Sequence, residues 1–149
     1  MIVNRQRAVR VALPPLKQFL SRVRDGLGLA NTDVTICLVS DAEIARMNEA
    51  YRKKKGPTDV LSFPAVARRK PVRLRRIANG PKLEAYLGDI AISPASAKRY
   101  ARKNGRRLPD ELRILILHGV LHLLGYDHET DHGEMNRIEN RLRKRFELA

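Results

Sequence analysis

Three of the four histidines in this 149-residue chain fall close together, in the stretch His118-Gly-Val-Leu-His122-Leu-Leu-Gly-Tyr-Asp-His128. Helix positions four apart lie on one face, about 5–6 Å apart at Cβ, so His118 and His122 can turn ring nitrogens toward one point. Gly125 can adopt a left-handed conformation that ends the helix and returns His128 to the same point. The spacing therefore predicts a metal site built from one helix and its exit turn.

Such a site suits zinc, which accepts three imidazoles and keeps its fourth position for water. Zinc lowers the pKa of that metal-bound water toward about 7, which makes it a hydrolytic nucleophile at neutral pH. The alternative is two core histidines and one surface histidine, but burying imidazoles without partners costs about 1–3 kcal/mol each. We therefore expect one Zn²⁺ per chain, although imidazoles also suit nickel and other ions.

The residues around the histidines narrow the chemistry. Metalloproteases with the pattern HxxxHxxGxxH carry a glutamate after the first histidine as general base, whereas this chain has Gly119 there. Peptide hydrolysis by that route therefore lacks its proton acceptor. His132 falls outside the spacing and is interpreted as a solvated residue, with a fourth metal ligand as the alternative. Asp89 and Asp127 are candidates to orient ligand histidines, and an ordinary turn role is the alternative for Asp127.

Strands and helices that position these residues are expected to alternate along the chain. Short apolar runs predict strands over Ala8–Ala12, Val34–Val39, Asp59–Phe63 and Leu87–Ile92. Capping residues and prolines predict helices from Pro14, from Ser40 with Glu43 to about Tyr51, from Ser93-Pro94 to about Lys103, from Pro109 to Gly125, and from about Thr130. These elements predict one α+β domain over residues 1–149, with a small mixed sheet of about four strands and about five helices.

Two of the expected helices have informative apolar patterns. The helix that carries the histidines is apolar almost all round, so we expect it to be buried. The last helix has a narrower stripe of Met135, Ile138, Leu142 and Phe146, so it should pack by one face.

The composition indicates a polyanionic partner. Lys and Arg number 30 against 16 Asp and Glu, giving a formal net charge of +14, and 43% of residues are hydrophobic, enough for a core. A nucleic-acid or ribonucleoprotein partner is favoured, with a merely soluble basic surface as the alternative. An acidic membrane is disfavoured because no long basic amphipathic helix with aromatic anchors is present. No apolar run suits a signal peptide or a membrane span, so a cytoplasmic location is expected. Cys37, the only cysteine, is interpreted as a packed thiol rather than a nucleophile.

Three motifs, in order, resemble those of the YbeY-type bacterial endoribonucleases over most of the chain. They are the histidine stretch His118–His128, the central stretch Asn48–Pro64 and the stretch Leu87–Ser93. The resemblance implies a zinc-bound single-domain α+β fold that cleaves RNA, in maturation of the 3′ end of small-subunit ribosomal RNA and in ribosome quality control. It also implies the ribosome as a partner, no small-molecule cofactor, and a functional need for Arg52.

The chemistry of the central stretch is compatible with that role. Arg52 precedes Lys53, Lys54 and Lys55 on an expected turn between a helix end and a strand. An arginine fork could bind the scissile phosphate in two contacts and stabilise charge in the transition state. The lysines could equally do no more than complement the dipole of the helix C-terminus.

A basic segment over residues 67–82 is longer than the corresponding loop in many family members. Its many charges and turn residues predict a mobile loop or hairpin that contacts RNA. The candidate contacts are Arg68, Arg69, Lys70, Arg73, Arg75 and Arg76.

These observations favour a metal-dependent endoribonuclease in which zinc polarises water or a phosphate oxygen and Arg52 assists at the phosphate. Two alternatives stay open. One is a ribosome-associated assembly factor whose zinc is mainly structural, with His132 as a possible fourth ligand that closes the site. The other is a metal-dependent hydrolase of another substrate. Attack by water would leave a 5′-phosphate, whereas attack by the neighbouring 2′-hydroxyl would leave a cyclic phosphate.

Overall fold

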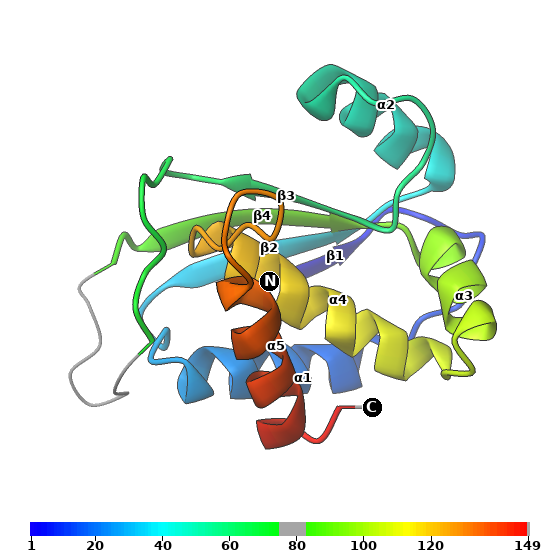
Figure 1. The fold of residues 1–149 in the computed structure, drawn as a ribbon. Coiled ribbons are helices and arrows are strands. Elements are labelled where there is room, and N and C mark those ends of the chain that lie inside the picture. The colour runs from blue at the N-terminus through cyan, green and yellow to red at the C-terminus, as the bar shows by residue number, and fades with distance from the viewer. Residues whose placement is uncertain (75–82, 149) are drawn as a thin grey trace.

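A four-stranded mixed sheet and five helices make up the computed structural model, which describes residues 1–74 and 83–148 (Figure 1). The strands are β1 (Ile2–Asn4), β2 (Asp33–Leu38), β3 (Val60–Pro64) and β4 (Tyr86–Ile92), and the helices are α1 (Leu13–Gly26), α2 (Asp41–Arg52), α3 (Pro94–Lys103), α4 (Leu108–Leu123) and α5 (Glu134–Arg145). The sheet order is β1-β2-β4-β3, with β2 parallel to both neighbours and β3 antiparallel to β4. The predicted α+β fold is therefore confirmed.

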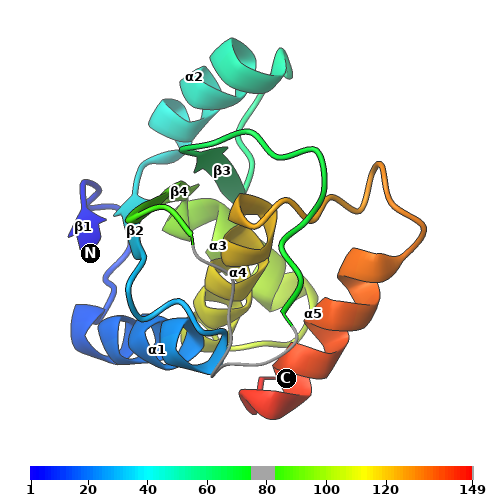
Figure 2. The same ribbon diagram turned by 90° about the vertical axis from the view of Figure 1, so that its left-hand side faces the viewer.

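The two faces of the sheet are covered by different helices (Figures 1 and 2). Alternate residues of β2 and β4, among them Ile36 and Ile90, join the main core with α1, α4 and α5. The intervening residues Cys37 and Ala91 belong to a smaller cluster with Ile44 of α2. Helix α4 is buried almost all round, as its composition predicts. Cys37 is a half-buried, packed thiol, and burial raises its pKa.

The predicted caps explain where the shorter helices begin. The Ser40 hydroxyl accepts a hydrogen bond from the Glu43 amide at the start of α2, and the Ser93 hydroxyl accepts one from the Ser96 amide at the start of α3. Helix α5 begins at Glu134, later than expected, because the Asp131 carboxylate accepts bonds from the amides of residues 133 and 135 and holds the preceding turn.

One predicted strand is wrong. Residues 8–12 form no strand, and β1 lies earlier, at Ile2–Asn4. The side chain of Gln6 exchanges two hydrogen bonds with the backbone of Val9, which closes a local turn and prevents an extended ladder there.

A membrane span has no support among residues 1–74 and 83–148, where every helix falls short of the length or the apolarity that a bilayer crossing requires.

Candidate functional site

The three clustered histidines converge at the C-terminal end of α4. One ring nitrogen of each of His118, His122 and His128 lies within 4.8 Å of the others, and the Nε2 atoms of His118 and His122 are 3.0 Å apart. Gly125 has a φ of +96° and turns the chain so that His128 returns to the end of the helix. The predicted geometry of helix plus exit turn is therefore confirmed.

A glutamate from α5 completes the environment of His118. Nδ1 of His118 lies 2.6 Å from Oε1 of Glu139. The other carboxylate oxygen of Glu139 pairs with Arg143 at 3.3 Å. Burial would raise the pKa of Glu139, but the hydrogen bond with His118 and the charge of Arg143 lower it overall. An ionised Glu139 keeps the proton on Nδ1 and leaves the Nε2 lone pair of His118 facing the other rings.

His122 also suits a metal. Burial and the neighbouring His118 lower the pKa of His122 to about 4, so its imidazole is neutral at physiological pH. Three imidazoles that face one point, one of them oriented by a carboxylate, form a donor set that fits zinc.

Glu139 was not among the residues predicted from the sequence. The signal was present, because Glu139 follows Ile138 and lies within one turn of Met135 and Leu142, inside the apolar stripe of α5. A carboxylate on a buried stripe needs a partner, and that partner is His118.

Gly119 occupies the position of the metalloprotease glutamate for a steric reason. A Cβ atom there would lie 2.8 Å from Cδ1 and 2.9 Å from Cγ2 of Ile90, a fully buried residue of β4. The carbonyl of Gly119 also accepts a hydrogen bond from the Ser62 hydroxyl of β3 at 3.2 Å. Close packing of α4 on the sheet therefore leaves no room for a general base at this position.

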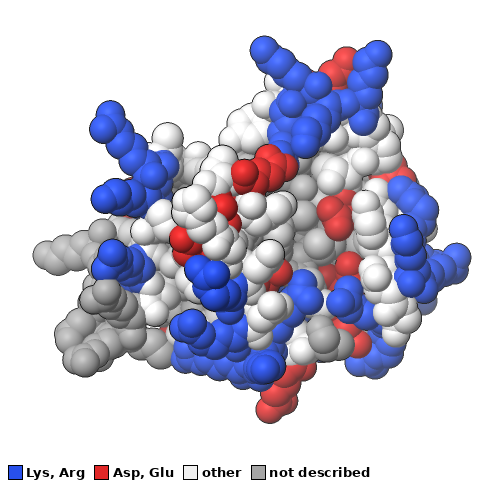
Figure 3. Space-filling view, in the orientation of Figure 1, with Lys and Arg blue, Asp and Glu red and all other residues white. Residues whose placement is uncertain are grey.

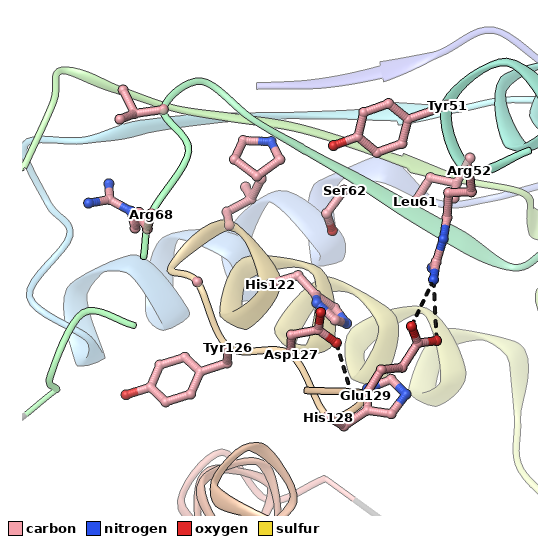
Figure 4. A pocket seen from close by; sticks show the side chains of 14 residues that line it. Tyr51, Arg52, Leu61, Ser62, Arg68, His122, Tyr126, Asp127, His128 and Glu129 are labelled. Atoms are coloured by element: carbon pink, nitrogen blue, oxygen red, sulfur yellow. Dashed lines mark hydrogen bonds and ion pairs between the residues drawn. The ribbon is translucent and has the colours of Figure 1, made fainter. Parts of the chain in front are cut away.

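A cleft of about 330 Å³ opens beside His122 and His128. Arg52, the last residue of α2, reaches across it to Glu129, with Nη2 at 3.3 and 3.4 Å from the two carboxylate oxygens (Figure 4). The positive charge of Arg52 contributes, behind larger effects, to lowering the pKa of His122. The structure thus places Arg52, His122 and His128 on one cleft, and sequence reasoning missed Glu129.

The predicted orienting aspartates lie in different places. Asp127 lines the cleft near His122, and its Oδ1 accepts the amide of Glu129 at 3.0 Å, as a turn aspartate does. Asp89 is exposed, accepts a hydrogen bond from Tyr86, and lies on the opposite face of β4 from Ile90, which packs on α4. That placement gives Asp89 no ligand histidine to orient.

His132 is exposed, and in the described part of the chain it is not one of the ligand atoms that converge with the other three histidines. Its backbone amide bonds to Glu134 at 2.6 Å.

Lys and Arg side chains lie in several groups on the face of the protein that Figure 3 shows. The predicted RNA-binding cations differ in their exposure. Lys53, Lys54 and Lys55 are exposed beyond the end of α2, and Arg69, Lys70 and Arg73 are exposed in the basic segment. The Arg68 side chain, by contrast, is 16% exposed and pairs with Glu84 at 2.6 Å, so it is engaged within the protein. Arg75 and Arg76 lie outside the described residues.

The first half of the basic segment is attached to the site and forms no hairpin in residues 67–74. The Val72 amide donates to the Leu124 carbonyl at 2.9 Å, and the Tyr126 hydroxyl donates to the Val72 carbonyl at 2.8 Å. A Cβ on Gly125 would lie 3.1 Å from Cα of Pro71. These contacts bring the segment against the exit turn that carries His128.

Known proteins with similar sequences share one description. The family model described as "Endoribonuclease YbeY" matches residues 2–147. The endoribonuclease YbeY of Koribacter versatilis is 40% identical over 99% of this chain and 86% of its own length, and that of Aquifex aeolicus is 38% identical over 94% and 87%. The solution structure of the Thermotoga maritima protein TM1509 aligns with a TM-score of 0.63 at 27% identity, over 98% of this chain and 89% of that one.

Proposed function

The chain belongs to the endoribonuclease YbeY family, and from this premise we propose that it is a zinc-dependent endoribonuclease that cleaves single-stranded RNA. We propose further that it acts in the cytoplasm, with the ribosome as partner, in small-subunit rRNA 3′-end maturation and ribosome quality control. The observation that carries the proposal is the convergence of His118, His122 and His128 beside a cleft that Arg52 lines together with His122 and His128.

The residues in and around the cleft have different proposed roles. A zinc ion held by the three histidines would supply a Lewis acid and lower the pKa of water. Glu139 holds His118 in the tautomer whose Nε2 can bind. Arg52 holds the phosphate with its guanidinium fork and stabilises charge that develops on it. Because Glu129 contacts Arg52 in the free protein, an incoming phosphate must either share Arg52 with the Glu129 carboxylate or replace that carboxylate.

The metal assignment is tested by metal content measured beside RNA cleavage. We expect one zinc per wild-type chain, and loss of both zinc and cleavage in His122→Ala. His132→Ala is the matched control and should keep both, since His132 lies outside the converging group. Equal cleavage by wild type and His122→Ala would contradict the assignment.

The products distinguish two routes of cleavage. A 5′-phosphate on the downstream fragment would indicate attack by water, whereas a cyclic phosphate on the upstream fragment would indicate attack by the 2′-hydroxyl. End-group analysis of one defined cleavage product decides between them.

Exposed cations beside the cleft are proposed to hold the RNA backbone. Replacing Arg69, Lys70 and Arg73 with Gln should weaken RNA binding and flatten its salt dependence while leaving bound zinc unchanged. Lys98, Arg102 and Lys103 of α3 are also exposed, but α3 contributes no residue to the cleft, whereas the basic segment contributes Arg68 and contacts the turn after α4; the Gln variant of the α3 residues is therefore the charge-matched control. An equal change in the salt slope of both variants would indicate non-specific attraction alone.

The assembly-factor alternative depends on a fourth protein ligand that closes the metal site. In the described residues His132 does not supply it. The enzyme is therefore the function that we propose.

A further inference from the structure

One wall of the cleft is apolar and aromatic, in contrast to its polar floor. The apolar and aromatic side chains of this wall come from the end of α2, from β3 and from the residues after it: Tyr51, Leu61, Pro64 and Val66. The polar floor comes from the end of α4 and the turn that follows: His122, Asp127, His128 and Glu129. Tyr51 is 55% exposed, and Val66 is also among the exposed large hydrophobic residues of the described chain. The metal and phosphate chemistry of the floor makes no use of this wall.

The ring of Tyr51 is held firmly from one side. Its centroid lies 4.7 Å from that of Phe63 of β3, with the ring planes tilted by 55°. Phe63 packs in turn against the smaller hydrophobic cluster between the sheet and α2. Figure 4 shows the Tyr51 ring over Ser62, on the β3 side of the cleft. A supported ring with much of its surface open is the arrangement that base stacking requires.

Tyr51 and Arg52 are adjacent in the last turn of α2, so one helix end presents both an aromatic ring and a guanidinium to the cleft. In Figure 4 the Arg52 side chain extends down toward Glu129 while the Tyr51 ring stays on the upper wall. A nucleotide likewise combines a charged phosphate with a flat apolar base. The pair therefore matches one nucleotide, or two neighbouring ones, of an RNA strand.

We propose that Tyr51 is a stacking platform for an unpaired base beside the phosphate that Arg52 binds. The proposal rests on the endoribonuclease function and assigns the selection of single-stranded RNA to this wall. A base within a duplex is stacked between its neighbours and cannot offer its face to the ring. Stacking accepts every base, so Tyr51 selects for strandedness rather than for sequence.

The test is a binding cycle between the tyrosine and the bases of a short unpaired RNA. Each base is replaced in turn by an abasic unit, and affinity is measured for the zinc-loaded wild type, Tyr51→Leu and Tyr51→Phe. In the wild type, one abasic position should weaken binding by about 5- to 100-fold. Tyr51→Leu should weaken binding of the intact RNA by a similar factor, and its affinity should no longer depend on whether the base at that position is present. Tyr51→Phe should keep both the wild-type affinity and its dependence on that base.

Controls separate stacking from a packing role for Tyr51. Tyr100→Leu, at an exposed tyrosine of α3 that does not line the cleft, should change nothing. A fully paired duplex should bind wild type and Tyr51→Leu equally. Wild-type sensitivity to abasic units that persists unchanged in Tyr51→Leu overturns the proposal, as does an absence of any sensitive position.

Cleavage by the wild type reports on the endoribonuclease function separately. A protein that cleaves RNA but shows no coupling between Tyr51 and any base disproves the stacking platform alone. Coupling in a protein that cleaves no RNA supports the platform and disproves the nuclease assignment.

Discussion

The end of α4 and the end of α2 face the same cleft, yet their functional side chains are held in different ways. At α4, the His118 side chain is 24% exposed and bonds to Glu139, which is 10% exposed, at 2.6 Å. At α2, Arg52 and Glu129 are 39% and 51% exposed and meet at 3.3 Å. Exposed ion pairs contribute about 0–1 kcal/mol, so Arg52 can exchange its partner cheaply. The proposed metal end is therefore fixed before substrate arrives, and the proposed phosphate end stays adaptable.

The largest effect is expected at the adaptable end. Arg52→Ala should reduce single-turnover cleavage by about 10²- to 10³-fold, because a donor to the developing phosphate charge is lost. Bound zinc should not change, since Arg52 is not a ligand. Arg52→Lys should recover little of the rate, because an ammonium lacks the two-pronged geometry. Wild-type cleavage by Arg52→Ala would remove the functional distinction between the two ends.

At the fixed end, Glu139→Gln should weaken zinc binding by about 10- to 100-fold in a chelator competition. The glutamine carbonyl can still accept a hydrogen bond from His118, so the variant isolates the effect of the charge. Glu147→Gln, at an exposed glutamate beyond the end of α5, is the matched control and should bind zinc normally. Equal affinity of the two variants would show that Glu139 does not tune the site.

Close packing of α4 on the sheet predicts a cost for Gly119→Ala. The new methyl group would meet Ile90, so overpacking should cost about 1–3 kcal/mol of the free energy of unfolding. Better helix propensity would return roughly 1 kcal/mol of that loss. Urea unfolding measures the net change, and Ile90→Val in the same chain should reduce the loss by removing Cδ1. An equal loss with and without Ile90→Val would mean that Cδ1 of Ile90 is not the obstacle.

The smallest effect concerns how α2 is anchored. Asp41 accepts hydrogen bonds from Ser93 and Ser96 and pairs with Arg99. Burial alone would raise the pKa of Asp41, but these partners lower it below its model-compound value of 3.8. Ionised Asp41 therefore stabilises the fold above that value, and the contribution is lost as the pH falls through the lowered pKa. Asp41→Asn should cost about 1 kcal/mol at pH 7 in chemical unfolding.

The pH dependence of this cost is the sharper measurement. The difference between wild type and Asp41→Asn should shrink as the pH falls below 3.8, the ordinary pKa of aspartate, and through the lowered pKa of Asp41 in the folded protein. A difference that is the same at pH 3 and pH 7 would show that the charge of Asp41 does not anchor α2.

Local patterns suffice to predict the metal end, and tertiary contacts decide most of the rest. The spacing from His118 to His128 needs only one helix and one turn, so sequence alone predicts it. The contact between Arg52 and Glu129 joins residues 77 apart, which no local pattern reveals. Glu139 depends on how α5 lies against α4.

The edges of the sheet show the same limit. Strand β1 has only three residues, and its place comes from parallel pairing of Ile2 with Ile36. The competing apolar run at residues 8–12 has better local strand character but is diverted by the turn at Gln6. Short strands are therefore assigned by their partners rather than by their own composition.

The ion pair of Arg68 with Glu84 and the tether at Val72 have a consequence for protein engineering. Arg68 and Glu84 are 16 residues apart in the sequence. Val72 lies between them in the sequence and is hydrogen-bonded to the residue after the end of α4. The exposed residues Arg69 and Lys70 therefore lie between two anchored points, Arg68 and Val72. A fluorophore attached at either of them would stay close to the histidine turn, giving a position for following RNA binding by the intact protein.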